Sequence, residues 1–231
     1  MIQARQGYRF SLDAVLLASF AGVRAGDMVA DLGAGCGVVS ILLARREPAC
    51  RIVALEIQPA MCDRARRSVL LNGLQQRVTV VEGDVRRASA LLGAGRFDLL
   101  VSNPPYWPAG SGKLPRAPEL ALARHELALT LGDLLAQAAL LLRPGGRLAL
   151  VHRAARLPEI VRLAHALGLS LARVRMVAPR PGAPPNLVLV EAKRGPAATE
   201  ELPLLVVYGE EGRYSDELLE CYLLPEPGPG G

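Results

Sequence analysis

The sequence predicts an α/β fold with a doubly wound, mostly parallel sheet of seven strands and an antiparallel C-terminal hairpin. Two observations lead to this expectation. Short apolar runs typical of buried strands alternate with longer segments of helical periodicity, and such alternation favours right-handed βαβ units. The last two strand patterns are separated only by RPGAPP at 180–185, so they should pair as a hairpin in which one strand runs against the rest.

The individual elements follow from local signals. A serine precedes the first apolar helical pattern, Pro59 stands at a first helical position, and Asn72 and Gly73 form a stop signal. The expected helices cover residues 11–23, 37–46, 59–73, about 86–93, 130–146 and 156–168. The expected strands cover residues 27–33, 51–57, 77–84, 97–101, 147–153, 169–179 and 186–194, and the segment 202–209 could add an edge strand.

Composition indicates one globular unit. Of 231 residues, 51% are hydrophobic and 21% are charged, which is ordinary for a folded domain. We expect a single domain over 1–223 and a disordered tail over 224–231, where glycine and proline dominate. The net charge of +5 is compatible with a polyanionic partner such as nucleic acid. A genome that favours arginine and alanine codons would produce the same balance.

The cysteines and the hydropathy pattern suggest where the protein works. No C-x-x-C spacing occurs among Cys36, Cys50, Cys62 and Cys221, so we expect free thiols, no metal site and a reducing compartment. No segment resembles a signal peptide or a membrane span. The expectation is a cytoplasmic protein without membrane contact, either a monomer or a homodimer.

A glycine-rich turn follows the first expected strand. DLGAGCG occupies residues 31–37, and Gly33 and Gly35 let the backbone turn tightly and approach a ligand closely because they carry no Cβ. Gly37 opens the next helix. The spacing G-x-G-x-G differs from the dinucleotide fingerprint G-x-G-x-x-G. Taken alone, the turn is also compatible with a plain strand-to-helix connection.

Acidic residues stand at the ends of the first three expected strands. They are Asp31, Glu56 and Asp84. Ligands of open α/β sheets bind at the carboxyl ends of the strands, so these acids should line one edge beside the glycine turn. Asp31 could face an ammonium directly or through water, Glu56 could accept both hydroxyls of a ribose, and Asp84 could accept from an adenine amino group. Each acid alone could be a strand-end cap or a solvated residue, but their joint placement predicts a cofactor site, which includes the neighbouring Ile57 and Val85.

This order of features resembles the class I S-adenosylmethionine-dependent methyltransferases, whose fold is Rossmann-like. The resemblance implies S-adenosylmethionine as the cofactor and S-adenosylhomocysteine as the product. Unlike a dinucleotide, that cofactor carries a sulfonium and an ammonium and no phosphate. Carboxylates therefore suit it better than the N-terminus of a helix, which favours anions.

The fourth expected strand ends in NPPY, which resembles the amino-methyltransferase motif of this class. An exocyclic amine or an amide nitrogen is a poor nucleophile because its lone pair is delocalised. The side-chain oxygen of Asn103 and the carbonyl of Pro104 could accept from its two N–H groups and hold the lone pair in line with a methyl donor. Pro104 and Pro105 fix φ and lack N–H donors, and Tyr106 offers a ring on which a base could stack. Asn103 belongs to both the catalytic set and the cofactor site; the alternative is a Pro-Pro turn that only ends a strand.

The motif leaves the substrate open, because NPPY is shared by adenine N6, cytosine N4 and protein glutamine methylases. The chain has no room for the target-recognition domain that restriction-type DNA methylases normally add. The segment before the first expected strand at 27–33 is too short for the N-terminal helical domain of release-factor glutamine methylases. A glutamine N5-methyltransferase, an enzyme acting on another RNA base such as one in rRNA, and an idle cofactor-binding module that only binds RNA remain as alternatives.

Several further segments resemble the bacterial tRNA1(Val) adenine N6-methyltransferase family. They lie at 2–20, 123–135, 150–160, 186–195 and 202–222. The resemblance spans nearly the whole chain and implies methylation of adenine N6 in tRNA next to the anticodon. It also implies that Ser11 and Asp13 lie near the methionine end of the cofactor, where the alternative is a helix cap and a solvated acid.

An RNA substrate would involve basic and aromatic residues around the site, because splayed bases stack on aromatic side chains. Candidates for phosphate contacts are Arg116, Arg124, Arg153 and Arg156. His125 could close the site over the substrate or simply begin a helix. His152 and His165 are expected in packing or on the surface, and Trp107 could widen the stacking platform or anchor its loop.

Overall fold

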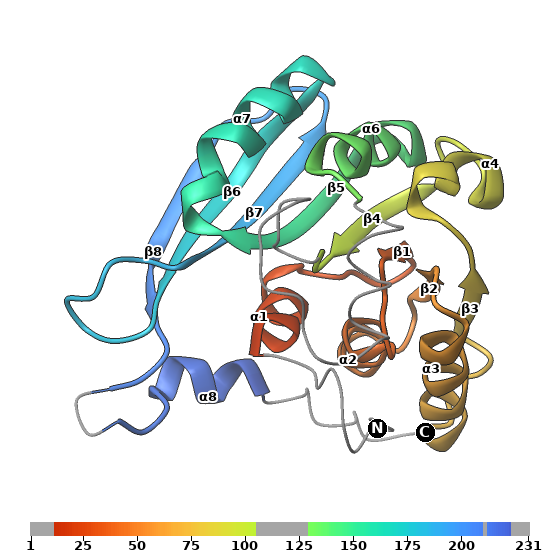
Figure 1. Ribbon diagram of the computed structural model, residues 1–231, viewed down its shortest axis with the longest axis horizontal. Helices are drawn as coiled ribbons and strands as arrows, with labels where there is room; N and C mark the ends of the chain where they lie inside the picture. The colour runs from red at the N-terminus through yellow and green to blue at the C-terminus, as the bar shows by residue number, and fades with distance from the viewer. Residues whose placement is uncertain (1–11, 105–128, 210–211, 223–231) are drawn as a thin grey trace, which may run out of the picture.

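A single twisted sheet with helices on both faces forms the frame of the molecule (Figure 1). The computed structural model describes residues 12–104, 129–209 and 212–222. The strands are β1 (Met28–Leu32), β2 (Arg51–Glu56), β3 (Val78–Glu82), β4 (Phe97–Ser102), β5 (Leu142–Arg153), β6 (Leu169–Ala178), β7 (Leu187–Arg194) and β8 (Glu200–Val206). The α-helices are α1 (Leu12–Phe20), α2 (Val38–Arg46), α3 (Pro59–Leu71), α4 (Ala88–Leu92), α6 (Leu131–Leu141), α7 (Leu157–Ala166) and α8 (Asp216–Tyr222). Short 3-10 turns are η1 (Val85–Arg87) and η2 (Ala154–Arg156).

The strand order is β3-β2-β1-β4-β5-β7-β6-β8, which confirms the predicted doubly wound sheet. Within the described residues, β7 is the strand that runs antiparallel to its neighbours β5 and β6, as the hairpin prediction required. The predicted count of seven strands is wrong, because β8 adds an eighth strand parallel to β6 at the edge. Pro203 interrupts this strand and weakens its sequence signal, and proline is tolerated on an edge because it costs no ladder bond there.

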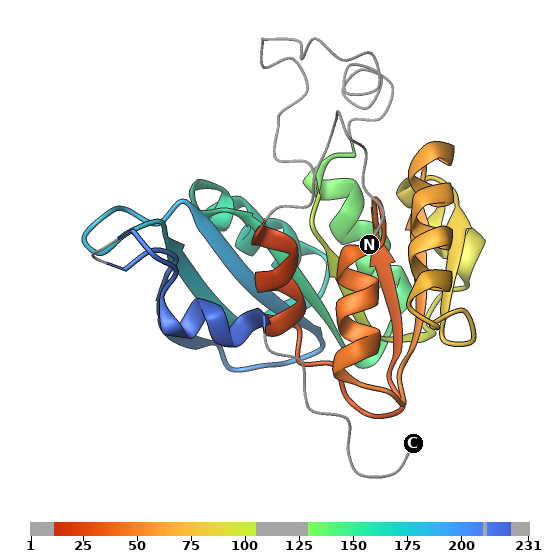
Figure 2. The same cartoon turned by 90° about the horizontal axis from the view of Figure 1, so that it is seen from below.

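Alternate residues of the central strands face two separate cores. Val29, Leu99 and Ala149 belong to a cluster with α1 and α2, whereas Ala30 and Leu100 belong to a cluster with α6 and α7. Figures 1 and 2 show the two layers of helices on opposite faces of the sheet. Burial on both faces explains why the central strands are continuous apolar runs.

The predicted helix 130–146 ends earlier than expected. Helix α6 stops at Leu141, and Leu142 already pairs with Phe97 of β4. Pro144 lacks the amide that a helix needs, and it pushes the residue before it out of helical geometry. The register between β4 and β5 then shifts before Arg147 pairs with Leu99, so β5 begins with an irregular turn and becomes regular where the strand was predicted.

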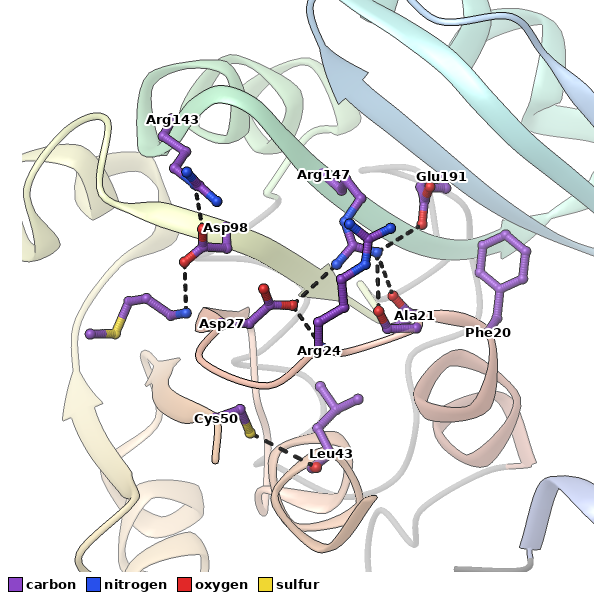
Figure 3. Close-up of polar contacts among 12 residues, drawn as sticks. Phe20, Ala21, Arg24, Asp27, Leu43, Cys50, Asp98, Arg143, Arg147 and Glu191 are labelled. Atoms are coloured by element: carbon purple, nitrogen blue, oxygen red, sulfur yellow. Dashed lines mark hydrogen bonds and ion pairs between the residues drawn. The ribbon is translucent and has the colours of Figure 1, made fainter. Parts of the chain in front are cut away.

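Buried charges close the edge of the sheet at which the parallel strands begin, which we call the amino edge (Figure 3). Arg147 is almost fully buried, and its guanidinium lies 3.1 Å from Asp27 Oδ2 and 3.6 Å from Glu191 Oε2. Arg173 donates to the same Glu191 oxygen at 2.6 Å and stacks over the ring of Phe20. Each buried carboxylate of this edge therefore has a guanidinium partner, as buried charges generally require.

None of the helices within the described ranges has the length and apolarity that a membrane crossing requires. The four cysteines are buried and form no disulfide. Across the part of the chain that the structure describes, no three His, Cys, Asp or Glu side chains come together as a ligand set for a metal ion.

Candidate active site

The order of the strands reverses direction between β1 and β4. The chain runs outward from β1 to β2 and β3, and then returns to place β4 on the other side of β1. The helices that follow β1 and β4 in the described residues, α2 and α6, therefore pack on opposite faces of the sheet. Such a switch point is where ligands bind in open α/β sheets. We call this the carboxyl edge.

The glycine turn opens toward the carboxyl edge. Gly33, Gly35 and Gly37 have φ angles of 77°, 56° and 80°, a region that side chains disfavour. The amides of Gly33 and Ala34 donate to the carbonyl of Leu55 at 2.9 and 3.0 Å, which anchors the turn to β2. A Cβ added to Gly33 or Gly35 would meet open space, whereas one on Gly37 would lie 3.3 Å from Ala65 Cβ. The first two glycines thus leave room for a ligand, and the third allows close packing of α2 on α3.

Asp31 lies at the end of β1 and is 1% exposed. Its Oδ2 atom accepts from Ser40 Oγ at 2.7 Å and from the Ser40 amide at 3.2 Å. Gly37 precedes α2 and has no side chain to cap it, so Asp31 supplies the missing acceptor to the third residue of the helix. Burial raises the pKa of the Asp31 carboxyl to about 6, although both contacts with Ser40 favour the ionised form.

Glu56 ends β2 and is also buried. Its two carboxylate oxygens accept from two backbone amides, one from Gly35 and one from Gln58, both at 2.8 Å. The side chain therefore ties the glycine turn to the start of α3. Neither Asp31 nor Glu56 lies within 4 Å of a cationic group among the described residues, so their negative charge is matched only by amides and one hydroxyl.

Asp84 differs from the other two acids. It follows β3, caps η1 by accepting from the Arg86 amide, and pairs with the Arg86 guanidinium at 2.5 Å. These hydrogen bonds to Arg86 hold the pKa of Asp84 below its usual range. Its side chain is partly exposed. A ligand amino group would have to share Asp84 with Arg86.

The two apolar residues predicted for the cofactor site, Ile57 and Val85, differ in burial. Val85 is 6% exposed and packs in the core with Leu55 and Leu92, so it supports the edge from behind. Ile57 is half-buried directly after Glu56. The amide of Gly83 donates to the carbonyl of Glu56 at 2.9 Å, which holds the ends of β2 and β3 together.

Asn103 and Pro104 follow β4 directly, on the other side of β1 from Glu56 and Asp84. Asn103 is half-buried and Pro104 is buried. Ser102, before them, donates from its hydroxyl to the carbonyl of Leu32 at 2.8 Å and so links the ends of β4 and β1. The predicted residues Pro105 and Tyr106 lie outside the described residues.

The remaining sequence candidates are dispersed. Asp13 lies in the first turn of α1, Arg153 ends β5, and Arg156 pairs with Glu159 at 2.5 Å. His152 is buried, and its Nδ1 atom accepts from the Arg153 amide at 2.8 Å, while His165 is exposed on α7. Five further candidates lie outside the described residues: Ser11, Trp107, Arg116, Arg124 and His125.

Sequence reasoning missed the two serines that hold this edge together, Ser40 and Ser102. Both are fully buried although they are polar. A signal for Ser40 existed, because the serine occupies the first turn of a helix that no side chain at Gly37 could cap. Ser102 could not have been found in this way, since its partner Leu32 lies seventy residues earlier in the chain.

The arrangement fits a cationic cofactor without phosphate. Within the described ranges, two buried carboxylates without ion pairs lie beside an open glycine turn, and buried charge of this kind is costly unless it is paired. The fold and this edge define a class I S-adenosylmethionine-dependent methyltransferase. The family model described as "Methyltransferase small domain" matches residues 12–178. The chain further belongs to the tRNA1(Val) (adenine(37)-N6)-methyltransferase family, in line with the resemblance found in the sequence.

Relatives of that name cover almost the whole chain. The one from Aeromonas hydrophila is 35% identical over 94% of this chain and 89% of its own length. The one from Porphyromonas gingivalis is 32% identical over 95% of this chain and 88% of its own. Among solved structures, a predicted O-methyltransferase from Agrobacterium tumefaciens superposes with a TM-score of 0.72 and 25% identity, and covers 94% of this chain and 99% of that chain. TrmN from Thermus thermophilus shares the fold, with a TM-score of 0.57 over 78% of this chain and 47% of that chain at 22% identity.

Proposed function

We propose that this enzyme methylates the exocyclic N6 nitrogen of an adenine in tRNA, next to the anticodon. The observation that carries the proposal is the 35% identity over 94% of the chain to a tRNA1(Val) (adenine(37)-N6)-methyltransferase. The position of Asn103 directly after β4, the strand that pairs with β1, supports it. Because tRNA is a cytoplasmic substrate, we also propose that the enzyme works there.

The residues of the carboxyl edge would divide the binding of the cofactor. Glu56 would accept from the ribose hydroxyls, since a carboxylate oxygen that holds one amide can still accept another donor. Asp31 would face the ammonium of the methionine part, directly or through water. Asp84 would accept from the adenine amino group, with Ile57 and Val85 beside it. Bound S-adenosylmethionine supplies a methyl group on a sulfonium, which leaves as the neutral thioether S-adenosylhomocysteine.

Asn103 and Pro104 would prepare the amine. The Asn103 side-chain oxygen and the Pro104 carbonyl would each accept from one N–H of the adenine amino group. Two acceptors favour a more pyramidal nitrogen and hold its lone pair in line with the methyl carbon. As the new N–C bond forms, the nitrogen becomes cationic and acidic, so one N–H proton passes to water without a strong base. Most of the rate would come from this positioning.

Nucleoside mass spectrometry of purified tRNA tests the proposal. A strain that lacks this gene should lose N6-methyladenosine from one tRNA, and the wild-type gene should restore it, whereas the Asn103→Ala gene should not. The purified enzyme should also transfer labelled methyl from S-adenosylmethionine to tRNA of the deletion strain.

Parallel assays with other acceptors distinguish the alternatives. If the enzyme methylates rRNA from the deletion strain, or a glutamine of a release factor, and does not methylate tRNA, then adenine in tRNA is not its substrate. Binding of cofactor and RNA without transfer to any acceptor would mean that the protein is an RNA-binding module.

A further inference from the structure

Ser40 is a buried polar residue for which the proposed mechanism has no use. It lies in the first turn of α2 with none of its surface exposed. Its hydroxyl donates to Asp31 Oδ2 at 2.7 Å, while its amide reaches the same oxygen at 3.2 Å. The amide contact alone would suffice to cap the helix. The shorter hydroxyl contact therefore calls for a second explanation.

The surroundings of Asp31 oppose its ionised form. The carboxyl is fully buried, which raises its pKa, and the negative charge of Glu56, at the end of the neighbouring strand β2, raises it further. Cys36 in the glycine turn is buried, and burial raises the pKa of its thiol, so it stays neutral and neither compensates nor adds to the charge of Asp31. Arg64 of α3 acts on Cys36 but does not pair with Asp31. The contacts from Ser40 are the interactions that favour the Asp31 carboxylate.

We propose that Ser40 is a positioning residue that keeps Asp31 ionised and oriented for the ammonium group of the cofactor. The proposal rests on the assignment of Asp31 to that ammonium group in the proposed function. A hydroxyl that donates to a carboxylate is a charge-assisted hydrogen bond, which is stronger than a neutral one. Ser40 thus offsets part of the free-energy cost of burying the Asp31 carboxylate. It does so without a positive charge, which would compete with the ammonium group of the ligand.

The roles of the two Ser40 donors can be separated by substitution. Ser40→Ala removes the hydroxyl and keeps the backbone amide, so Asp31 can still cap α2. Loss of one hydrogen bond to the charged form should raise the Asp31 pKa by about one unit. Affinity for a cationic ligand follows the ionised fraction of Asp31. It should therefore fall about fivefold at pH 6, where the ionised fraction drops from about one half to about one tenth, and be nearly unchanged at pH 8.5.

Calorimetric titration between pH 5 and 8.5 with two ligands provides the test. S-adenosylhomocysteine carries the ammonium group, whereas 5′-methylthioadenosine shares the adenosine and the thioether and lacks it. In the wild type, affinity for S-adenosylhomocysteine should rise through a midpoint near pH 6, and affinity for methylthioadenosine should not. In Ser40→Ala, the midpoint should move to about pH 7 for S-adenosylhomocysteine only.

Two controls separate this effect from a loss of packing. Ser68→Ala removes another fully buried helix serine, in the second half of α3, and should leave the midpoint at its wild-type value. Asp31→Asn removes the titrating group, so adding Ser40→Ala to it should produce no pH-dependent change. If Ser40→Ala does not fold, Ser40→Cys, which offers a weaker donor of similar size, should show a smaller shift in the same direction.

The outcomes separate the two claims. A wild type without a difference in pH dependence between the two ligands would refute the assignment of Asp31 to the ammonium. The role of Ser40 would be refuted, and the assignment of Asp31 kept, if the wild type shows that difference but the Ser40→Ala midpoint stays near pH 6. An affinity loss in Ser40→Ala that is equal at every pH would have the same meaning.

Discussion

The amino and carboxyl edges of the sheet both bury carboxylates, and they differ in what those carboxylates meet. At the amino edge, Asp27 and Glu191 share the guanidinium of Arg147 (Figure 3). Arg173 adds a second cation for Glu191. At the carboxyl edge, and in the part of the chain that the structure describes, Asp31 and Glu56 accept only from amides and from the Ser40 hydroxyl.

This difference shows how one sheet separates stability from function. A carboxylate that has its cation within the chain is compensated inside the fold, so loss of that cation destabilises the fold, and the carboxylate has little attraction left for a ligand. A carboxylate held by neutral donors keeps its negative charge for a cation that arrives from outside. Substitutions at the amino edge should therefore change the free energy of unfolding, and those at the carboxyl edge should change binding or turnover.

The largest effect is expected from Arg147→Met. The substitution keeps a long apolar side chain and removes the cation that Asp27 and Glu191 share, so it should lower the free energy of unfolding by about 3–5 kcal/mol. Urea denaturation measures this loss. Arg143→Ala is the control, since its partner is Asp98 but its own side chain is 60% exposed, and it should cost less than about 1 kcal/mol.

The same variants test whether the amino edge is separate from the active site. The folded Arg147→Met protein should bind S-adenosylhomocysteine with the affinity of the wild type. The division between the two edges would be refuted if Arg147→Met has the same free energy of unfolding as the wild type. It would also be refuted if the folded variant no longer binds S-adenosylhomocysteine.

Asn103→Ala should have the next largest effect, and on turnover alone. Removing one acceptor that positions the amine should lower kcat by about 10²–10³-fold, because it disturbs the alignment of the lone pair with the methyl group. Affinity for S-adenosylhomocysteine and the urea midpoint should stay close to the wild type. Single-turnover methylation of tRNA measures the change.

A matched substitution sharpens this prediction. Asn72→Ala removes the amide that donates to the Ser68 carbonyl at the end of α3. It should cost some stability and leave kcat unchanged. If Asn103→Ala folds normally but no longer binds cofactor, the role assigned to Asn103 is misplaced.

Asp31→Asn should have a smaller effect, and it should raise the free energy of unfolding where Arg147→Met lowers it. The folded pKa of Asp31, about 6, lies above its unfolded value of 3.8, so the wild type loses stability as pH rises from about 4 to 6. Asparagine avoids this loss and can still accept from Ser40. At pH 7.5 the variant should be more stable by about 1–3 kcal/mol while binding S-adenosylhomocysteine more weakly.

The pH dependence must be measured as a difference between the two proteins. His152 has the opposite effect, because burial lowers its pKa to about 4, so its contribution grows as pH rises through the range from 4 to 6.5. Subtracting the Asp31→Asn unfolding curve from that of the wild type removes this term. The difference should disappear below pH 4, and an equal difference at every pH would mean that Asp31 does not titrate as its burial implies. Asp63→Asn, on the exposed side of α3, serves as the control without effect.

The accuracy of the sequence predictions depended on how local each signal was. The ends of β1, β2 and β4 were predicted because a buried apolar run stops where the chain meets a glycine, an acid or a proline, and each signal lies within a few residues. The sequence indicates β8 only as a possible edge strand, because Pro203 obscures its pattern and its partner β6 is not adjacent in the sequence. The end of α6 was misplaced since the pairing of Leu142 with Phe97 takes over before Pro144.

By itself, the sequence determined the alternation of strands and helices, the glycine turn, and the residue types at the strand ends, because these follow from local periodicity and backbone stereochemistry. Only the tertiary structure decided which charges are neutralised. Arg147 meets Asp27 because β5 lies beside β4 and β4 beside β1, and no pattern in the sequence specifies that contact. Asp31 and Asp84 have similar positions in the sequence pattern, yet one is buried against a serine and the other is paired with Arg86. The strength of a charge depends on its burial and its partners, and both are set by long-range packing.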